Sequence, residues 1–508
     1  MRIDGSSPLV SPTVARALTD LRSSFEDLNR QLTTGKKADT YGGLGNGRSI
    51  SLAMRSRLSE IDGFRSTITD VKLRVDLMAT TLTRINDLGT QQRSDTSPTE
   101  NTLIGNGQTR AQLAAGTRFQ EVLSLLRTDV NGRHLFAGRS TEAEPVLDAK
   151  TILDGSGTQV GLRQVIAERR LADRGTVEVD LAGTDTVGRL SIAQPSGTGF
   201  TLTEDGAHPF GFKLVGGSTS IAGASVSPAL GGPPASVTID MPSQPTAGQT
   251  VRLTVQLPDG TRDEITLTAT TNTPKAGEFQ IGASASATLK NLRDGVVTAL
   301  DERSRTTLAA ASSVTAAQGF FAAGPTTPPK RVPAPAETAT TLVDGTASDT
   351  VTWYTGDDDP SVSARDGISA QIDRAVSVSY GVRANEAGIT KTVAALAIFA
   401  AETYTAGDTD QPSRHQALAD RVRSALAPTE GVNTLSGIQV ELAGVQRSMK
   451  AISERHDTIA GVTQDLIDNT ENADTDEVAT KLLAVNTRLQ ATYQTTSMLS
   501  QLSLVNYL

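Results

Sequence analysis

The chain has 508 residues and a mass of 53.1 kDa, which at roughly 150 residues per domain predicts about three or four compact units. Apolar residues make up 37% of it and aromatic residues only 4%, so its cores must be built mainly from Ala, Val, Leu and Ile. A net charge of −9, from 47 Lys and Arg against 56 Asp and Glu, disfavours nucleic acid as a partner. There is no Cys, and the four His are far apart in sequence, which disfavours redox and zinc chemistry.

The opening residues contain no apolar run of signal-peptide length, and no segment approaches the roughly 20 apolar residues that span a bilayer. We therefore expect no membrane insertion and no export by the general secretory route. Both a cytosolic location and an export route that leaves the N-terminus uncleaved are compatible with the absence of Cys.

The first predicted helix has apolar residues spaced alternately four and three apart, the heptad pattern of a helix that packs against partner helices. These residues are Val14, Leu18, Leu21, Phe25, Leu28 and Leu32. The helix should end at Gly35, before a glycine-rich loop over residues 41–47. A second, much longer helix is predicted from Met54 to Ile85, and a third from about Gln108 to Val130, ending at a dipeptide that favours a tight hairpin turn.

After Pro145, short β-type runs alternate with Thr, Ser, Gly and Pro, as at residues 176–181 and 251–257. The second run leads through a Pro-Asp-Gly turn into residues 264–268, which predicts a hairpin. Breaks at residues 231–234 and 325–335 divide this region, and an amphipathic helix is predicted near residues 285–313. The middle of the chain therefore reads as two small β-rich subdomains.

Helical pattern returns from about Asn385, and a heptad row runs from Leu435 to Ile459. A last helix, from about Asp476, carries apolar residues on one face at Val478, Leu482, Val485, Leu489, Tyr493, Leu499 and Leu502. Because these rows at both ends flank a β-rich middle, we expect an α+β fold in which both termini form a long coiled-coil helical bundle and the middle is a β-rich insert.

The expected domain boundaries follow from this arrangement. They are residues 1–48 with 470–508 as a terminal coiled-coil domain, 49–145 with 350–469 as a helical rod, 146–230 as a β-rich outer subdomain, and 231–349 as a second outer subdomain with one helix.

Three features of the sequence resemble sites of chemistry: the segment from Gly42 to Ser49, the aspartates at residues 357–359, and His456. Gly42-x-x-x-x-Gly47-Arg48-Ser49 resembles a phosphate-binding loop, but it follows a heptad helix instead of a buried strand, so we interpret it as a helix connection. The run of aspartates at residues 357–359 lies near the only tryptophan and is ended by Pro360, which favours a solvated acidic turn over a calcium site.

His456 occupies a heptad position, where a metal or proton-transfer role would need a carboxylate or second His on a neighbouring helix. We interpret it as a polar residue that sets helix register, with a metal or proton-switch role as the alternative. No recognised arrangement of Ser, His, Asp or metal ligands occurs, so we expect no catalytic residue, no cofactor, no metal and no enzyme activity.

The two ends of the chain together resemble the bacterial flagellin superfamily. The resemblance rests on residues 28–37 (LNRQLTTGKK) and 82–88 (LTRINDL), and on residues 472–477 (NADTDE), 489–493 (LQATY) and 502–508 (LSLVNYL). It covers about residues 1–145 and 380–508. Within the superfamily, residues 131–138 (NGRHLFAG) followed by Pro145 resemble the hairpin of the hook-filament junction protein, hook-associated protein 3, with His134 in the place of a Tyr.

The resemblance implies a structural subunit of the bacterial flagellum, exported and polymerised by packing of its terminal helices, with the junction favoured and the main filament as the alternative. It implies a helical homopolymer or ring, contacts with the hook and other axial proteins, and a cytosolic export chaperone. The expected polymerisation interface comprises the heptad residues of both ends: Val14, Leu18, Leu21, Phe25, Leu28, Leu32, Val478, Leu482, Val485, Leu489, Tyr493, Leu499 and Leu502.

An alternative of another class is an adhesin or glycan-binding module carried on a helical stalk. Exposed aromatic residues on one face of the insert would favour it, but the candidates Phe200, Phe210 and Phe212 are few and could all be core residues.

Overall fold

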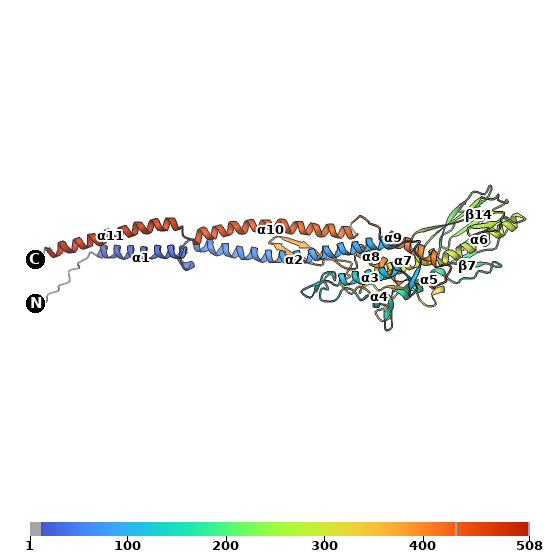
Figure 1. Cartoon of the computed structure of the whole chain (residues 1–508), viewed down its shortest axis with the longest axis horizontal. Coiled ribbons are helices and arrows are strands. Elements are labelled where there is room, and N and C mark those ends of the chain that lie inside the picture. The colour runs from blue at the N-terminus through green and yellow to red at the C-terminus, as the bar shows by residue number, and fades with distance from the viewer. Residues whose placement is uncertain (1–11, 432–433, 506–508) are drawn as a thin grey trace. The chain divides into compact units, whose positions relative to one another are not determined.

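The structure is a computed structural model that describes residues 12–431 and 434–505 (Figure 1). The chain divides into two compact units. Unit 1 comprises Met1–Val71, Gln371–Val378 and Arg447–Leu508, and unit 2 comprises Lys72–Ala370 and Ser379–Gln446.

Unit 1 is built from long helices at both ends of the chain and the tip of one hairpin. Its elements are α1 (Pro12–Thr34), the 3-10 helix η1 (Tyr41–Leu44), the first part of α2 (Gly47–Asp95), the last part of α10 (Leu435–Glu471), α11 (Thr475–Val505), and the tip of the hairpin formed by β18 (Ser369–Asp373) and β19 (Val376–Ser379). The predicted end of the first helix is confirmed: Gly35 has a φ of +66°, the left-handed conformation that glycine adopts readily.

The rest of α2 and α10 belongs to unit 2, together with further helices. These are α3 (Arg110–Leu126), α4 (Ala149–Asp154), α5 (Leu162–Arg174), α6 (Ala285–Arg305), α7 (Thr307–Phe321), α8 (Ala387–Ala401), α9 (Gln411–Ala425) and the 3-10 helix η2 (Ala336–Thr338). The predicted apolar row of the second helix is buried here at Val75, Met78, Leu82 and Ile85. The most apolar helix, α8, is buried along almost its whole length and lies against α3, α7 and α9.

This helical part of unit 2 also contains short pairs of β-strands. They are β1 (Leu103–Gly105) with β2 (Gln108–Thr109), β3 (Asp129–Val130) with β4 (Arg133–His134), β5 (Gly155–Ser156) with β6 (Gln159–Val160), and β16 (Lys330–Arg331) with β17 (Val343–Asp344). The predicted hairpin after the third helix is confirmed as β3–β4, and its two turn residues, Asn131 and Gly132, both have positive φ.

The β-rich region holds two larger sheets. One has the strand order β11-β12-β9-β8-β7 and the other β10-β13-β14-β15. Their strands are β7 (Asp185–Val187), β8 (Leu190–Ile192), β9 (Gly199–Glu204), β10 (Lys213–Thr219), β11 (Ser225–Val226), β12 (Ser236–Asp240), β13 (Thr250–Gln256), β14 (Arg262–Thr270) and β15 (Glu278–Gln280). The predicted hairpin is confirmed, because β13 and β14 pair in antiparallel fashion from Thr250↔Thr268 to Gln256↔Arg262.

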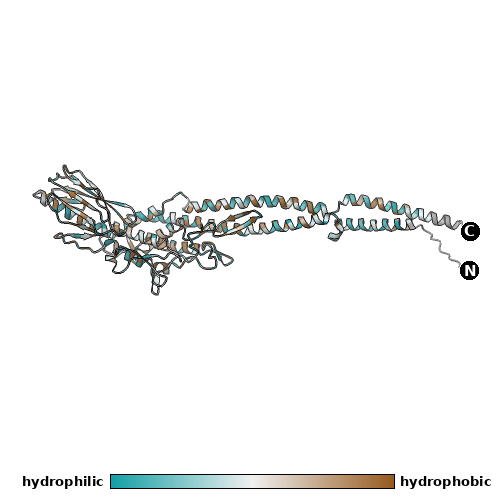
Figure 2. Cartoon of the chain, turned by 180° about the vertical axis from the view of Figure 1, so that it is seen from behind, coloured by the Kyte–Doolittle hydropathy of each residue, from teal (hydrophilic) through white to brown (hydrophobic). Residues whose placement is uncertain are grey.

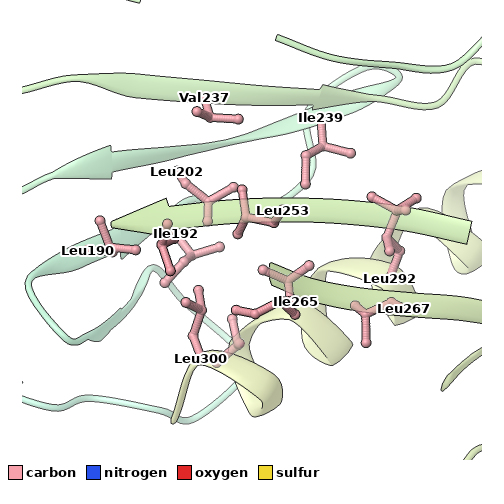
Figure 3. Close-up of a cluster of buried hydrophobic side chains, with 14 of the residues drawn as sticks. Leu190, Ile192, Leu202, Val237, Ile239, Leu253, Ile265, Leu267, Leu292 and Leu300 are labelled. Atoms are coloured by element: carbon pink, nitrogen blue, oxygen red, sulfur yellow. The ribbon is translucent and has the colours of Figure 1, made fainter. Parts of the chain in front are cut away.

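Both sheets and helix α6 enclose one hydrophobic cluster (Figure 3). Every second residue of β9, β12 and β13 is buried, as expected for strands with one face on a core. Leu292 and Leu300 of α6 point into the same cluster as Leu202 and Leu253 of the strands. The two sheets therefore share a core.

Two sequence predictions for this region are wrong. Residues 176–181 do not form a strand; they make only the isolated bridge Glu178↔Thr186, and Leu181 has a φ of +60°. The helix predicted near residues 285–313 is divided into α6 and α7 at Thr306, whose φ of −115° and ψ of −88° are not helical.

The fold class is α+β, with helices from both ends of the chain and a β-rich middle, as predicted. The four-part division into domains is finer than the two compact units and stays a prediction. Within the described residues, no helix is at once long enough and apolar enough to span a bilayer.

Candidate functional site: the paired terminal helices

In unit 1, α1 and α11 lie side by side, and the start of α1 is at the same end of the pair as the end of α11 (Figure 1). The pair is therefore antiparallel. The heptad rows predicted separately at the two ends of the chain thus meet within one subunit.

The heptad residues of α1 are half-buried in this pair. The half-buried residues are Val14, Leu18, Leu21, Phe25 and Leu28. Leu32, the last residue of the row, is exposed. A single partner helix covers only one side of a heptad row, which leaves the other side of each residue accessible.

On α11, two residues of the predicted row are more deeply buried than the heptad residues of α1. Val478 is 5% exposed and Leu489 is 7% exposed, while Leu482 and Val485 between them are half-buried. Tyr493 is exposed. The side chains of Leu499 and Leu502, also predicted for this interface, lie outside the described part of the structure.

Other large apolar residues of α11 lie off this buried row. Leu483 is 68% exposed, and at 100° per residue it projects more than a quarter turn away from Leu482 and Leu489. Met498 is exposed as well. Figure 2 shows apolar stretches alternating with polar ones along both helices. The pair therefore carries apolar surface that its own two helices do not cover.

The two helix breaks of unit 1 lie at the same level and are joined by backbone hydrogen bonds. Lys36 and Asn472 form an antiparallel bridge. The Lys37 N–H donates to the Glu471 carbonyl and the Ala473 N–H donates to the Gly35 carbonyl, each at 2.8 Å. Two of the segments that resemble flagellins, residues 28–37 and 472–477, are thus brought together.

An ion pair fastens the same joint. The carboxylate of Glu471, at the end of α10, accepts hydrogen bonds from Arg55 Nε at 2.8 Å and Arg55 Nη2 at 2.7 Å. The Ser51 hydroxyl is a further donor. These hydrogen bonds, that from Arg55 above all, lower the pKa of Glu471 to about 2. Sequence reasoning missed this pair because its members are more than 400 residues apart.

The phosphate-loop mimic is confirmed as a helix connection. It follows α1, passes through η1, and its last residues, from Gly47, form the first turn of α2. No buried strand precedes it, so the arrangement that cradles a phosphate is not formed.

The aspartates at residues 357–359 are held by specific partners and are not simply a solvated turn, which corrects the sequence interpretation: the side chain of Asp357 is 9% exposed, although that of Asp359 is 37% exposed. Asp357 accepts from Arg139 Nε and from Arg383 Nη2, both at 2.9 Å, and these contacts, led by the Arg139 hydrogen bond, lower its pKa to about 2. Asp358 accepts from the N–H and hydroxyl of Thr326. The run is a structural clamp, and its partners come from distant parts of the sequence.

The segment that resembles the junction-protein hairpin, residues 131–138, forms the β3–β4 turn and the buried residues after it. Leu135, Phe136 and Ala137 are buried, and His134 Nδ1 lies 2.8 Å from the Arg127 carbonyl. Of the aromatic residues that an adhesin role would need, Phe200, Phe210 and Phe212 are all buried. They offer no exposed aromatic platform.

The two ends of this α+β chain pair as helices and leave apolar surface uncovered. Residues 9–141 match the bacterial flagellin N-terminal helical region, a stretch that includes α1, α2, α3 and the β3–β4 hairpin. The match covers about a quarter of the chain, and it supports the bacterial flagellin superfamily and a structural role in the flagellum. A search of curated proteins finds no match to the chain.

Proposed function

We propose that this chain is a structural subunit of the bacterial flagellum that polymerises through α1 and α11, at the junction of hook and filament. The observation that carries the proposal is the α1–α11 pair, whose heptad rows are only half-covered and whose Leu483 projects outward. Burying a leucine contributes about 1.5 to 3 kcal/mol, so repeated contacts with further copies would stabilise a polymer.

The distribution of charge supports a second copy of the chain as the partner. Unit 1 carries 16 basic and 17 acidic side chains, a net charge of −1, whereas unit 2 carries 31 and 39, a net charge of −8. Identical subunits repel one another through net charge, and a nearly neutral part can approach its own copy with little repulsion.

The proposed interface keeps the residues predicted from the sequence, from Val14 to Leu32 on α1 and from Val478 to Leu502 on α11. The product is a helical homopolymer or a ring, in contact with the hook and other axial proteins, and a cytosolic chaperone covers the helices before export. The proposed domain roles follow: residues 1–48 and 470–508 polymerise, and the β-rich insert faces outward.

The proposed location of the subunit at the hook-filament junction rests on residues 131–138, which resemble the hairpin of the junction protein. The main filament is the second candidate, favoured by the large β-rich insert with its two sheets and shared core. Immunogold labelling of intact cells separates them: label confined to the distal end of the hook means the junction, and label along the filament means flagellin.

One pair of variants tests polymerisation itself. Leu483→Asp places a charge on the uncovered apolar face of α11, and Gln490→Asp places the same charge seven residues later on the same exposed side. We expect Leu483→Asp to prevent assembly of purified protein, seen by electron microscopy, with helical circular dichroism unchanged. Gln490→Asp should assemble. Assembly of Leu483→Asp at the parent rate would contradict a contact through this face.

A further inference from the structure

The sequence contains three Asn-Gly pairs, and this dipeptide carries a chemistry of its own. The pairs are Asn46–Gly47, Asn106–Gly107 and Asn131–Gly132. Glycine has no Cβ to shield its amide nitrogen, so that nitrogen can attack the side-chain amide of the preceding asparagine. The backbone conformation of each pair decides whether the two groups can meet.

Two of the pairs form tight turns in which the reacting groups are turned apart. Asn106 has a φ of +49° and Asn131 a φ of +56°, and the glycine after each also has a positive φ. A residue in this left-handed region has a ψ of about +30° to +60°. Because this ψ turns the next nitrogen to the side opposite Cβ, the glycine nitrogen lies away from the asparagine side chain. Each turn must therefore open before its pair can react.

Further contacts hold these two turns closed. The Gly132 N–H donates to Oδ2 of Asp129 at 3.0 Å. The nitrogen must lose this hydrogen before it attacks, and the carboxylate opposes the negative charge that would develop on it. The Gly107 carbonyl accepts the N–H of Tyr404 at 2.7 Å, and a Cβ on Gly107 would lie only 2.3 Å from the Tyr404 carbonyl oxygen. Both glycines are thus fixed in place.

The Asn46–Gly47 pair differs from the other two. Asn46 is exposed, its φ is not positive, and its side chain makes no hydrogen bond with a described residue. Gly47 is the first residue of α2, so its N–H has no acceptor within the helix, and the positive end of the helix stabilises negative charge on this nitrogen. A Cβ on Gly45, just before the pair, would meet no atom within 4 Å, so the loop has room to adjust.

We propose that Asn46 is a site of spontaneous deamidation in the folded chain, whereas Asn106 and Asn131 are held unreactive. The Gly47 nitrogen gives its proton to a base in the solvent and forms a bond to Cγ of Asn46, and the side-chain nitrogen takes up a proton from solvent and leaves as ammonia. Water then opens the resulting succinimide ring at one of its two carbonyls and yields aspartate or isoaspartate. The net reaction consumes one water and releases one ammonia.

The reaction places a new negative charge in the loop between α1 and α2. It changes the net charge of unit 1 from −1 to −2. Aspartate is as favourable as asparagine at the residue before a helix, so the aspartate product should leave α2 in place. Isoaspartate adds one backbone atom to the connection between the two helices. Since only one subunit takes part, the reaction does not depend on the proposed polymerisation.

Incubation of the purified whole chain at mildly alkaline pH, followed by trypsin digestion and mass spectrometry, tests the proposal. Trypsin releases residues 38–48 and 128–133 as separate peptides, each with a single asparagine. In the folded chain, deamidation of the first peptide should be at least about tenfold faster, because the second requires its turn to open. In urea the two rates should converge. Equal rates in the folded chain, or reaction of residues 38–48 only in urea, would overturn the proposal.

Three variants separate the chemistry of the pair from the mobility of its loop. Gly47→Ala shields the attacking nitrogen and should slow deamidation of Asn46, with only Cγ2 of Thr470 as close as 3.0 Å to the new methyl group. Gly42→Ala, in the same loop, is the matched control and should react like the parent. Asp129→Ala should speed deamidation in residues 128–133. Equal slowing by both glycine variants, or no change in Asp129→Ala, would contradict the assignment, provided that the helical circular dichroism matches that of the parent.

Discussion

Arg293 of α6 and Asp185 of β7 form an ion pair in which both side chains are 0% exposed. Arg293 Nη2 also donates to the carbonyls of Gly183 at 2.9 Å and Ile192 at 3.1 Å. Asp185 Oδ1 accepts the N–H of Asp180 at 2.8 Å. The pair thus ties α6 to the five-stranded sheet and to the loop that the sequence wrongly predicted as a strand.

Replacing Arg293 with Met should destabilise unit 2 by about 3 to 5 kcal/mol, because it leaves the Asp185 carboxylate buried without a cation. Adding Asp185→Asn should recover part of the loss. Urea unfolding followed by the fluorescence of Trp353, a buried residue of unit 2, measures both. Arg252→Met, which removes a surface ion pair with Glu264, is the control and should cost less than about 1 kcal/mol. An unchanged midpoint in Arg293→Met would contradict the role of the pair.

Replacing both Leu482 and Leu489 with Asp should abolish assembly. Leu489 is also buried against α1 of its own chain, so the helical circular dichroism of α1 and α11 should fall as well. The Trp353 unfolding transition should stay where it is. The matched control is Asn486→Asp with Gln490→Asp, two exposed positions of the same helix. A large shift of the Trp353 transition would show that α11 supports unit 2.

Glu471→Gln should lower the melting temperature of the helices of unit 1 at pH 7. The folded state holds the pKa of Glu471 at about 2, below the ordinary value of 4.5, so the folded chain binds this proton less readily than the unfolded chain. The stabilisation is fully present above about pH 4.5 and is lost as the pH falls towards 2. Melting followed by circular dichroism at pH 7 and pH 2.5 should therefore separate parent and variant at pH 7 and bring them together in acid. Equal melting at pH 7 would contradict this.

Acid should destabilise unit 2 well before its carboxylates titrate. Burial lowers the pKa of both His208 and His415, despite the opposing Asp205 carboxylate beside His208. Below about pH 6.5 the unfolded chain therefore binds more protons than the folded chain, and stability falls as the pH falls. His208→Gln with His415→Gln should flatten the decline in the Trp353 unfolding midpoint between pH 7.5 and 5.5. A decline as steep as the parent's would assign the effect to other groups.

The parts of the fold that follow from local periodicity could be predicted, and the parts that depend on long-range contacts could not. The heptad rows of α1, α2, α10 and α11 give the helices directly, because each row repeats over several turns. The charged contacts of unit 1 join residues with no shared local pattern: Asp373 is 83 residues from His456, and Arg55 is 416 residues from Glu471. The carboxylate that lies beside His456 belongs to Asp373 of the β18–β19 hairpin and not to a neighbouring helix, and no local pattern around His456 indicates it.

The backbone bridge between Lys36 and Asn472 has a mechanical consequence for unit 1. The two helical segments are interrupted at the same level and are hydrogen-bonded to each other there. A rotation of α1 about this joint would therefore move α11 with it. Around Gly35 and Ala473 both segments leave the helical conformation, so a change of angle between α1–α11 and the rest of unit 1 can be taken up there without breaking the hydrogen bonds within the helices.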